Sequence, residues 1–361
     1  MSDTASLHAL QIESHKGTYD VRFDSNALSH LNADMPEDAH FIIDRRVAEL
    51  YTDDLRDVLT SDSTLLIEVS ENAKSLERFP AYVDHLVTRN IRRNHKLIAI
   101  GGGVIQDITA FLAATLLRGV DWIFYPTTLL AQADSCIGSK SSINSGGIKN
   151  ILGTFTPPRS VHINTRLCKT LTEVDRRSGV GEMLKAHTIA GPEQFEAIAA
   201  DYDRIFEDPD VMMDYVRRSL EIKKAFVEKD EFDRGPRLIF NYGHSFGHAI
   251  ETTTDFAVPH GIAVTIGMDM ANFIASRMSL TDKSFFERMH PVLRTNYRGF
   301  ENHHIPPDDV IAALGKDKKN VGADVTLILP GKDGRLHKHI QTVDRVFREN
   351  CREYLEAVRR S

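Results

Sequence analysis

The sequence has few of the features that mark secreted or membrane proteins. Its three cysteines, Cys136, Cys168 and Cys351, are far apart and odd in number, and none belongs to a CxxC pair. This usage excludes a disulfide framework and favours a reducing, cytoplasmic location. The N-terminus has no apolar signal segment, and polar residues interrupt the apolar runs before they reach the length of a membrane span. We therefore expect no membrane partner.

The chain also lacks an excess of basic residues. It has 44 Lys and Arg against 51 Asp and Glu, a formal net charge of -7. Because general nucleic-acid binders carry a basic face, this balance argues against a nucleic-acid partner. It leaves room for a local basic pocket that binds an acidic substrate. At 361 residues, of which 42% are hydrophobic, the chain has the composition of a soluble globular protein and the length of two domains.

The first half of the chain alternates short apolar strands with helical segments. Strands are expected at residues 41–44, 65–69 and 96–100. This alternation predicts an α/β fold with a parallel sheet, in which ligands bind at the carboxyl ends of the strands. From about residue 172 the pattern becomes mostly helical. We therefore predict an α/β domain of residues 1–172 and an α-helical domain of residues 173–361.

A glycine-rich turn follows the third of these strands. Gly101, Gly102 and Gly103 stand between the apolar run and a helical pattern. Three glycines let a backbone approach a pyrophosphate, and a helix N-terminus favours negative charge. The GxGxxG spacing is missing, so a plain strand–helix turn is an equal alternative. Asp44, one βα unit earlier, suits either a ribose hydroxyl or the cap of the next helix.

Residues 135–150 are polar and rich in glycine, and they carry Lys140 and Lys149. A solvated surface loop is the default for this composition. The apolar segments on either side also fit a loop that lines a cleft. Further along, Glu182 and Lys185 stand three residues apart, on one face of an expected helix. A surface ion pair is the plain alternative, but the small and apolar neighbours favour burial.

The stretch around which the chain is organised is residues 237–251, RLIFNYGHSFGHAIE. In a helix, His244 and His248 share one face and can converge on one metal ion or one anion. Gly247 costs helix stability, which predicts close packing against its backbone. For HxxxH alone, two satisfied core histidines are the better interpretation. His260, twelve residues on, reverses that preference.

Taken together, these motifs resemble those of the sugar phosphate cyclase family, and within it most closely the 3-dehydroquinate synthase type. The resemblance covers about residues 44–330. It implies an N-terminal NAD-binding α/β domain and a mostly α-helical C-terminal domain that holds a divalent metal, usually zinc or cobalt. The motifs that carry it are GGGVIQD, LLRGVDWIFYPTTLLAQADSCIGSK, Lys149-Asn150, GEMLK, RLIFNYGHSFGHAIE and the later PHG.

The resemblance also implies roles for individual residues. It makes Glu182, His244 and His260 the metal ligands and turns His248 toward the substrate phosphate instead. We expect catalytic roles for Lys140, His248, Lys185, Asn150 and Arg118. Substrate-binding roles are expected for Asp134, Lys223, Arg237, Asn241 and Lys318. The positions that match the NAD site are Asp44, Glu71, Lys74, Gly102, Gly103, Asp107, Thr127, Thr128 and Lys149.

The activity that the resemblance implies is the conversion of 3-deoxy-arabino-heptulosonate 7-phosphate to 3-dehydroquinate. NAD takes a hydride from C5, the ketone acidifies the neighbouring C–H, and phosphate leaves. The hydride returns, the ring opens, and an intramolecular aldol reaction closes the carbocycle. The metal polarises substrate oxygens. Arg237 suits the carboxylate as a planar bidentate group, whereas Lys140, Lys223 and Lys318 suit phosphate and carboxylate as point charges.

The sequence departs from the family pattern around the expected NAD turn and substrate loop. Gln106 and Ser139 stand where glycine is usual, residues 145–148 differ, and Ile262 stands where glutamate is common. A sister cyclase that acts on another heptulose, an amino-heptulosonate or a hexose phosphate therefore stays open.

Relatives whose substrates lack a carboxylate tend to change the arginine, the asparagine or the second histidine of the central stretch. Arg237, Asn241 and His248 are all kept here, which favours a carboxylate-bearing acidic sugar phosphate. A metal-dependent NAD polyol dehydrogenase is the alternative of another class, distinguished by lasting NADH. A homodimer is the habit of the family.

Overall fold

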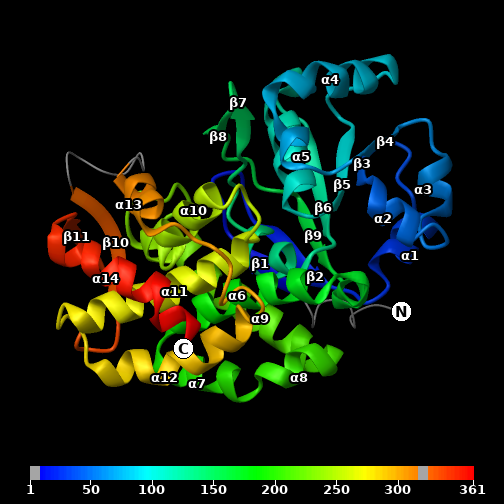
Figure 1. Ribbon diagram of the computed structural model, residues 1–361. Helices are drawn as coiled ribbons and strands as arrows, with labels where there is room; N and C mark the ends of the chain where they lie inside the picture. The colour runs from blue at the N-terminus through cyan, green and yellow to red at the C-terminus, as the bar shows by residue number, and fades with distance from the viewer. Residues whose placement is uncertain (1–8, 316–323) are drawn as a thin grey trace. The chain divides into compact units, whose positions relative to one another are not determined.

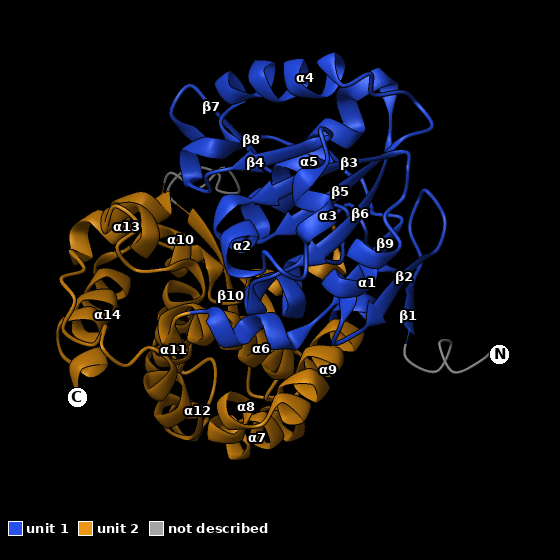
Figure 2. Ribbon diagram, turned by 90° about the vertical axis from the view of Figure 1, so that its right-hand side faces the viewer, with its two compact units in different colours: residues 1–171, 223–232 blue, residues 172–222, 233–361 orange. Residues whose placement is uncertain are grey.

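The computed structural model describes residues 9–315 and 324–361 of the chain. Lys318 lies outside the described residues. The chain divides into two units, coloured blue and orange in Figure 2. Unit 1 is drawn from residues 1–171 and 223–232, and unit 2 from residues 172–222 and 233–361.

The division differs from the sequence-based boundary at residues 223–232, which return to unit 1. The physical reason lies in three side chains of that segment. Lys223 forms an ion pair with Asp134, with 2.7 Å between Nζ and Oδ1. Glu228 accepts a hydrogen bond from the backbone of Glu13, and Glu231 accepts one from the backbone of His15. Long-range polar contacts of this kind leave no local pattern in a sequence.

Unit 1 is built on a sheet whose described strands follow the order β1-β2-β9-β6-β5-β3-β4 (Figure 1). The expected apolar runs form β3 (Ala39–Asp44), β4 (Thr64–Ile67) and β5 (Lys96–Gly101). Neighbouring strands pair in parallel, except for the antiparallel pair β1–β2. This confirms the parallel α/β prediction. The other strands are β1 (Ala9–Ile12), β2 (Tyr19–Phe23), β6 (Asp121–Pro126), β7 (Ile143–Ser145), β8 (Ile148–Leu152) and β9 (Ser160–Ile163).

The parallel register brings the ends of β3, β5 and β6 to one edge of the sheet. Ile43 pairs with Ile100, and Gly101 pairs with Pro126, so Asp44 and the glycine turn follow neighbouring strands. The helix after the turn packs on β3, β5 and β6. The helices of this unit are α1 (Ala27–Ala33), α2 (Arg45–Leu50), α3 (Arg56–Thr60), α4 (Phe79–Thr88) and α5 (Gly103–Thr115).

The expectation of a plain loop at residues 135–150 is wrong in its second half. Strands β7 and β8 form an antiparallel hairpin in which Ser145 pairs with Ile148. Gly146 and Gly147, with φ of 57° and 77°, make its turn. Two consecutive positive φ angles are what a tight hairpin turn with the sheet's twist requires, and the Gly-Gly pair was the sequence signal for it.

Unit 2 is mostly helical and is organised around α11 (His260–Arg277), in which Gly261 to Ala275 are all buried. A helix that is buried on all sides belongs inside a bundle, and α11 contacts α6, α10, α12 and α14 (Figure 1). Strands β10 (Asp324–Pro330) and β11 (Leu336–Thr342) form a hairpin. The other helices are α6 (Glu173–Ala190), α7 (Pro192–Ala200), α8 (Tyr202–Glu207), α9 (Pro209–Val227, whose end lies in unit 1), α10 (His244–Thr253), α12 (Lys283–Asn296), α13 (Pro307–Gly315) and α14 (Arg345–Glu356).

Glycines set how closely α10 and α11 approach. A Cβ on Gly247 would lie 3.1 Å from backbone atoms of Val264, which confirms the predicted close packing. A Cβ on Gly267 would lie 2.1 Å from the carbonyl oxygen of Gly243. Gly243 itself adopts a φ of 75° just before α10, a conformation that favours glycine. Among the described residues, no helix has both the length and the apolarity needed to cross a membrane.

A substitution at Gly267 tests this packing. We expect Gly267→Ala to lower the free energy of unfolding by about 1–3 kcal/mol, because the added methyl group must push α10 and α11 apart. Urea denaturation of the metal-free protein measures the change. Gly315→Ala is the matched control, since a Cβ at Gly315 meets no atom within 4 Å. Equal stability of the two variants would contradict the role of Gly267.

Candidate functional site

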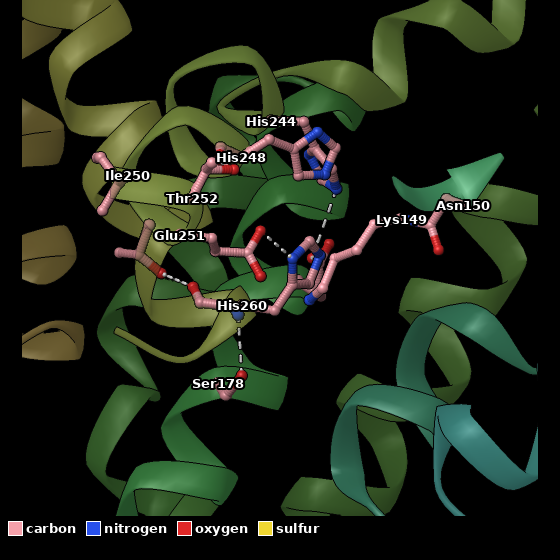
Figure 3. A network of polar contacts seen from close by, with 12 residues as sticks. Lys149, Asn150, Ser178, His244, His248, Ile250, Glu251, Thr252 and His260 are labelled. Carbon is pink, nitrogen blue, oxygen red and sulfur yellow. Dashed lines mark hydrogen bonds and ion pairs between the residues drawn. The ribbon is translucent and has the colours of Figure 1, made fainter. Parts of the chain in front are cut away.

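Three histidines and one glutamate converge in unit 2. The imidazole donor atoms of His244, His248 and His260 lie within 4.8 Å of one another, and Figure 3 shows the rings turned toward each other. Glu182 reaches the same point from α6. Its Oε1 lies 3.3 Å from Nε2 of His260 and 3.7 Å from Nε2 of His244. The convergence of imidazoles that HxxxH and His260 together predicted is confirmed.

Two of the rings are held by partners on their far side. Nδ1 of His244 lies 3.1 Å from the carbonyl oxygen of Tyr242. A carbonyl only accepts hydrogen bonds, so Nδ1 carries the proton and Nε2 keeps its lone pair for the cluster. Nδ1 of His260 lies 3.0 Å from Oε2 of Glu251 (Figure 3). Partners of this kind orient the histidine ligands of metal sites.

Glu251 is a functional residue that no sequence motif had singled out. It closes the GHAIE motif on the same helix as His244 and His248. The signal that could have found it is a carboxylate a short distance before a candidate histidine ligand. Glu251 and His260 are nine residues apart in the sequence. Only the turn between α10 and α11 brings them together.

Glu182 and Lys185 form a buried pair, not a surface one. Their side chains are 1% and 2% exposed, and Lys185 Nζ lies 2.5 Å from Glu182 Oε2. Burial opposes ionisation of Glu182, but Lys185 and the two nearby histidines hold its pKa well below the usual value. Burial and Lys185 lower the pKa of His244 well below its usual value. Glu182 is therefore an anion and His244 a neutral imidazole, the forms that bind metals.

His260 has the opposite tendency. Burial lowers its pKa, but the carboxylates of Glu182 and Glu251 outweigh burial and raise the pKa to about 10. A metal must therefore displace a proton from His260 when it binds. In a tetrahedral site with metal–ligand bonds of about 2.0–2.2 Å, neighbouring donor atoms lie roughly 3.4 Å apart. The distances from Glu182 fit that spacing, and a carboxylate with imidazoles suits zinc or cobalt.

In unit 1, the glycine turn packs against the end of β6. The amide of Thr127 donates to the carbonyl oxygen of Gly101 over 2.9 Å. A Cβ on Gly102 would lie 2.8 Å from the side chain of Thr128, so Thr128 leaves room only for glycine. A Cβ on Gly103, by contrast, would meet no atom within 4 Å. Gly102 is therefore needed for close packing against Thr128. At Gly103, the N-terminus of α5 has open space beside it.

Several residues predicted to bind NAD lie in one ionic network close to this turn. Lys74 Nζ lies 3.0 Å from Asp107 Oδ2 on α5 and 3.1 Å from Asn150 Oδ1. Glu71 lies 3.6 Å from Lys74 and 3.4 Å from Lys149. Burial lowers the pKa of Lys74, but Asp107 and Glu71 more than compensate and raise it. The network therefore keeps a buried cation charged.

Asn144 belongs to the same network, although its sequence context gave no sign of this. Its amide donates to Glu71 Oε1 over 2.9 Å, and its Oδ1 accepts from the backbone of Asn150 over the same distance. Asn150 has a φ of 52°, a left-handed conformation that asparagine tolerates better than most side chains. The β7–β8 hairpin thus holds Asn150 in place through Asn144.

The other residues predicted for the site differ in burial and in hydrogen-bond partners. Asp44 caps α2 by accepting from the backbone of Arg46 over 2.9 Å, so the capping interpretation is confirmed. Arg118 is exposed with a φ of 65°. Arg237 is buried, and the amide of Asn241 donates to the carbonyl oxygen of Leu238. By unit, the predicted substrate residues are Arg118, Asp134, Lys140, Asn150 and Lys223 in unit 1 and Lys185, Arg237, Asn241 and His248 in unit 2.

Comparison with known families agrees with this arrangement. Residues 64–178 match the family model described as 3-dehydroquinate synthase N-terminal, and residues 179–320 match the model described as 3-dehydroquinate synthase C-terminal. The 3-dehydroquinate synthase of Dictyoglomus thermophilum is 36% identical over 291 residues, which cover 80% of this chain and 81% of that protein.

Two solved structures have the same fold. One is 2-deoxy-scyllo-inosose synthase complexed with carbaglucose-6-phosphate, NAD+ and Co2+, with a TM-score of 0.85 and 23% identity, covering 96% of this chain and 99% of that one. The other is 2-epi-5-epi-valiolone synthase from Streptomyces hygroscopicus with NAD+ and Zn2+ bound. Its TM-score is 0.81 at 25% identity, and the match covers 94% of this chain and 97% of that one.

Substitutions in the cluster test its ability to hold a metal. We expect His260→Ala to lose most of its bound zinc or cobalt on dialysis, because it removes one donor. Glu251→Gln should weaken metal binding by about 10–100-fold, because the ring loses its orienting carboxylate. Elemental analysis and competition with a chelator measure both effects. His337→Ala, at an exposed position of β11, is the control. Full metal retention by His260→Ala would refute the assignment.

Proposed function

Since the chain belongs to the 3-dehydroquinate synthase family, we propose that it converts 3-deoxy-arabino-heptulosonate 7-phosphate to 3-dehydroquinate. The observation that carries the proposal is the cluster of Glu182 with His244, His248 and His260, in which two rings have fixed outer partners. A phosphate-eliminating cyclase needs such a centre to act on substrate hydroxyls. NAD and zinc or cobalt are the proposed cofactors, as bound in the two related synthase structures.

The metal ligands proposed for this chain are Glu182, His244 and His260. A bound divalent metal polarises substrate oxygens and lowers the pKa of the reacting alcohol. Lys185, 2.5 Å from Glu182, keeps that carboxylate ionised and ready to bind a cation. His248 is the most exposed of the three histidines. That exposure suits its proposed role of contacting the substrate phosphate.

Unit 1 is the proposed NAD-binding unit. Its turn presents the N-terminus of α5 at Gly103, which favours a pyrophosphate. Lys74 and Lys149 lie near it in ion pairs with Asp107 and Glu71 and offer N–H donors to a ligand there. Asp44 lies at the end of the neighbouring strand for a ribose hydroxyl. NAD supplies a hydride acceptor that is regenerated in each turnover. Thr127 and Thr128 complete the proposed NAD site next to the glycines.

The charged residues of the proposed substrate site match an acid sugar phosphate. Arg237 is 6% exposed, and its planar guanidinium suits a carboxylate held by two parallel hydrogen bonds. Lys140 and Lys223 suit phosphate oxygens or a carboxylate as point charges. Retention of Arg237, Asn241 and His248 favours this substrate over heptulose or hexose phosphates without a carboxylate. A sister cyclase with such a substrate is the second candidate, because Gln106 and Ser139 depart from the family pattern.

The three cysteines are buried thiols, which fits the proposed cytoplasmic location. A homodimer, as is usual in the family, is part of the proposal.

The reaction itself is the first test. With catalytic NAD and zinc or cobalt, we expect purified protein to release stoichiometric phosphate from 3-deoxy-arabino-heptulosonate 7-phosphate, with no lasting absorbance of NADH. Release from another heptulose, amino-heptulosonate or hexose phosphate, but not from this substrate, would make the protein a sister cyclase. Lasting NADH without phosphate would identify it as a dehydrogenase.

The carboxylate role of Arg237 gives a second test. Arg237→Ala should raise KM for the acid substrate by roughly 10–100-fold, the value of a charge-assisted hydrogen bond. Arg237→Lys should recover only part of the loss, because it keeps the charge but not the bidentate geometry. Arg277→Ala, which removes an exposed pair with Glu353, is the control. Unchanged steady-state kinetics for Arg237→Ala would exclude the role.

A further inference from the structure

Two segments of unit 1 are joined at both of their ends. We name residues 134–140 the lysine loop, because it ends at Lys140, and residues 223–232 the strap. At one end, Lys223 Nζ lies 2.7 Å from both Oδ1 and the carbonyl oxygen of Asp134. At the other end, the hydroxyl of Ser139 donates to Oε1 of Glu231. The segments are therefore fixed to each other as one piece.

Glu231 also ties this piece to the N-terminal part of the chain. Its Oε2 accepts from the backbone of His15 over 2.7 Å, and its Oε1 lies 3.0 Å from His15 Nδ1. The side chain of Glu231 is only 9% exposed. Burial opposes its ionisation, but the hydrogen bonds from Ser139 and His15 lower its pKa. Hydrogen bonds to an ionised acceptor are stronger than neutral ones, so this carboxylate is an effective anchor.

Ser139 is held in a conformation that a serine rarely adopts. Its φ is 63°, which favours glycine. Serine at this position accepts an unfavourable backbone conformation, but its hydroxyl donates a hydrogen bond to Glu231 that glycine could not make. The carbonyl oxygen of Ser139 accepts from the backbone of Thr156 over 2.7 Å, and Lys140 forms a β-bridge with Phe155. Fixing Ser139 thus fixes the point from which the Lys140 side chain starts.

Gln106 binds the opposite end of the lysine loop. Its Nε2 donates to the carbonyl oxygen of Ser135, and its Oε1 accepts from the hydroxyl of Ser135, both over 2.6 Å. Gln106 is 6% exposed, so the two bonds are sheltered from water. Gln106 and Ser139 stand at the two positions where, as noted above, the family pattern has glycine. Each therefore brings a polar side chain that glycine lacks. Both use their polar groups to hold this loop.

We propose that Ser139 and Glu231 are positioning residues, which act through the lysine loop and the strap to fix Lys140 and Lys223 for an anionic group of the substrate. Lysine offers a point charge on a flexible stem, so its backbone must be fixed before the charge can be placed accurately. The anionic group is a phosphate or carboxylate of an acidic sugar phosphate, an identity that rests on the proposed function. The clamp itself does not depend on that identity.

A double-mutant cycle in the full-length protein tests the clamp. We expect Ser139→Ala and Glu231→Gln each to lower kcat/KM for the acid sugar phosphate about tenfold, chiefly through KM, and the double variant to cost no more than Glu231→Gln alone. Ser139→Gly should lose the same activity although it relieves the backbone strain, and should melt no lower than Ser139→Ala. The proposal would be overturned if the losses of kcat/KM in the two single variants multiplied in the double variant. Full activity of Ser139→Gly would also overturn it.

Amide hydrogen exchange tests the clamp without any turnover. Ser139→Ala, a change in the lysine loop, should speed exchange in the strap as well as in the loop. Glu231→Gln, a change in the strap, should likewise speed exchange in both segments. Ser160→Ala removes a hydroxyl that contacts His162 on β9 and serves as the control. Faster exchange confined to the substituted segment would overturn the clamp. An inactive wild-type protein would instead refute the proposed function, since the exchange measurement is unaffected by it.

Discussion

The ionised carboxylate of Glu182, buried in unit 2, is the constraint on which the proposed metal centre depends. An isolated buried anion costs several kcal/mol, so the surrounding structure must supply positive charge or a cation. Lys185 supplies part of it at 2.5 Å, and two imidazoles stand at 3.3 and 3.7 Å. Close contact between α10 and α11 through Gly243, Gly247 and Gly267 makes this possible. The glycines of the central motif therefore allow the close helix packing that brings the histidines to Glu182.

Unit 1 contains the reverse case, a buried cation that is stabilised by carboxylates. Lys74 is a buried cation, and Asp107 and Glu71 keep it charged, while Asn144 and Asn150 complete its surroundings. The network lies close to an open helix N-terminus at Gly103, where positive potential is already present. A parallel sheet explains why such groups gather here, because its strands deliver their following residues to one edge.

The sequence was sufficient for the features that have a local period or spacing. Strand–helix alternation predicted the parallel sheet, HxxxH together with His260 predicted convergent imidazoles, and the small neighbours of Glu182 predicted its burial. It was insufficient where the contact is distant or where a turn was overlooked. Glu251 orients His260 only because the turn between α10 and α11 brings them together. The β7–β8 hairpin was missed although Gly146 and Gly147 signalled it. The return of residues 223–232 to unit 1 depends on Asp134 and His15, both far away in the chain.

The strap has a consequence for how the protein is made. Unit 1 is not a continuous piece of chain, because its Glu231 anchor is synthesised after more than fifty residues of unit 2. Domains fold as they emerge from the ribosome, the N-terminal one first. Here the sheet of unit 1 has all its strands by residue 163, yet the partners of Asp134, Ser139 and the backbone of His15 arrive only with residues 223–231. A nascent chain paused before that point would carry a completed sheet whose lysine loop is still untied.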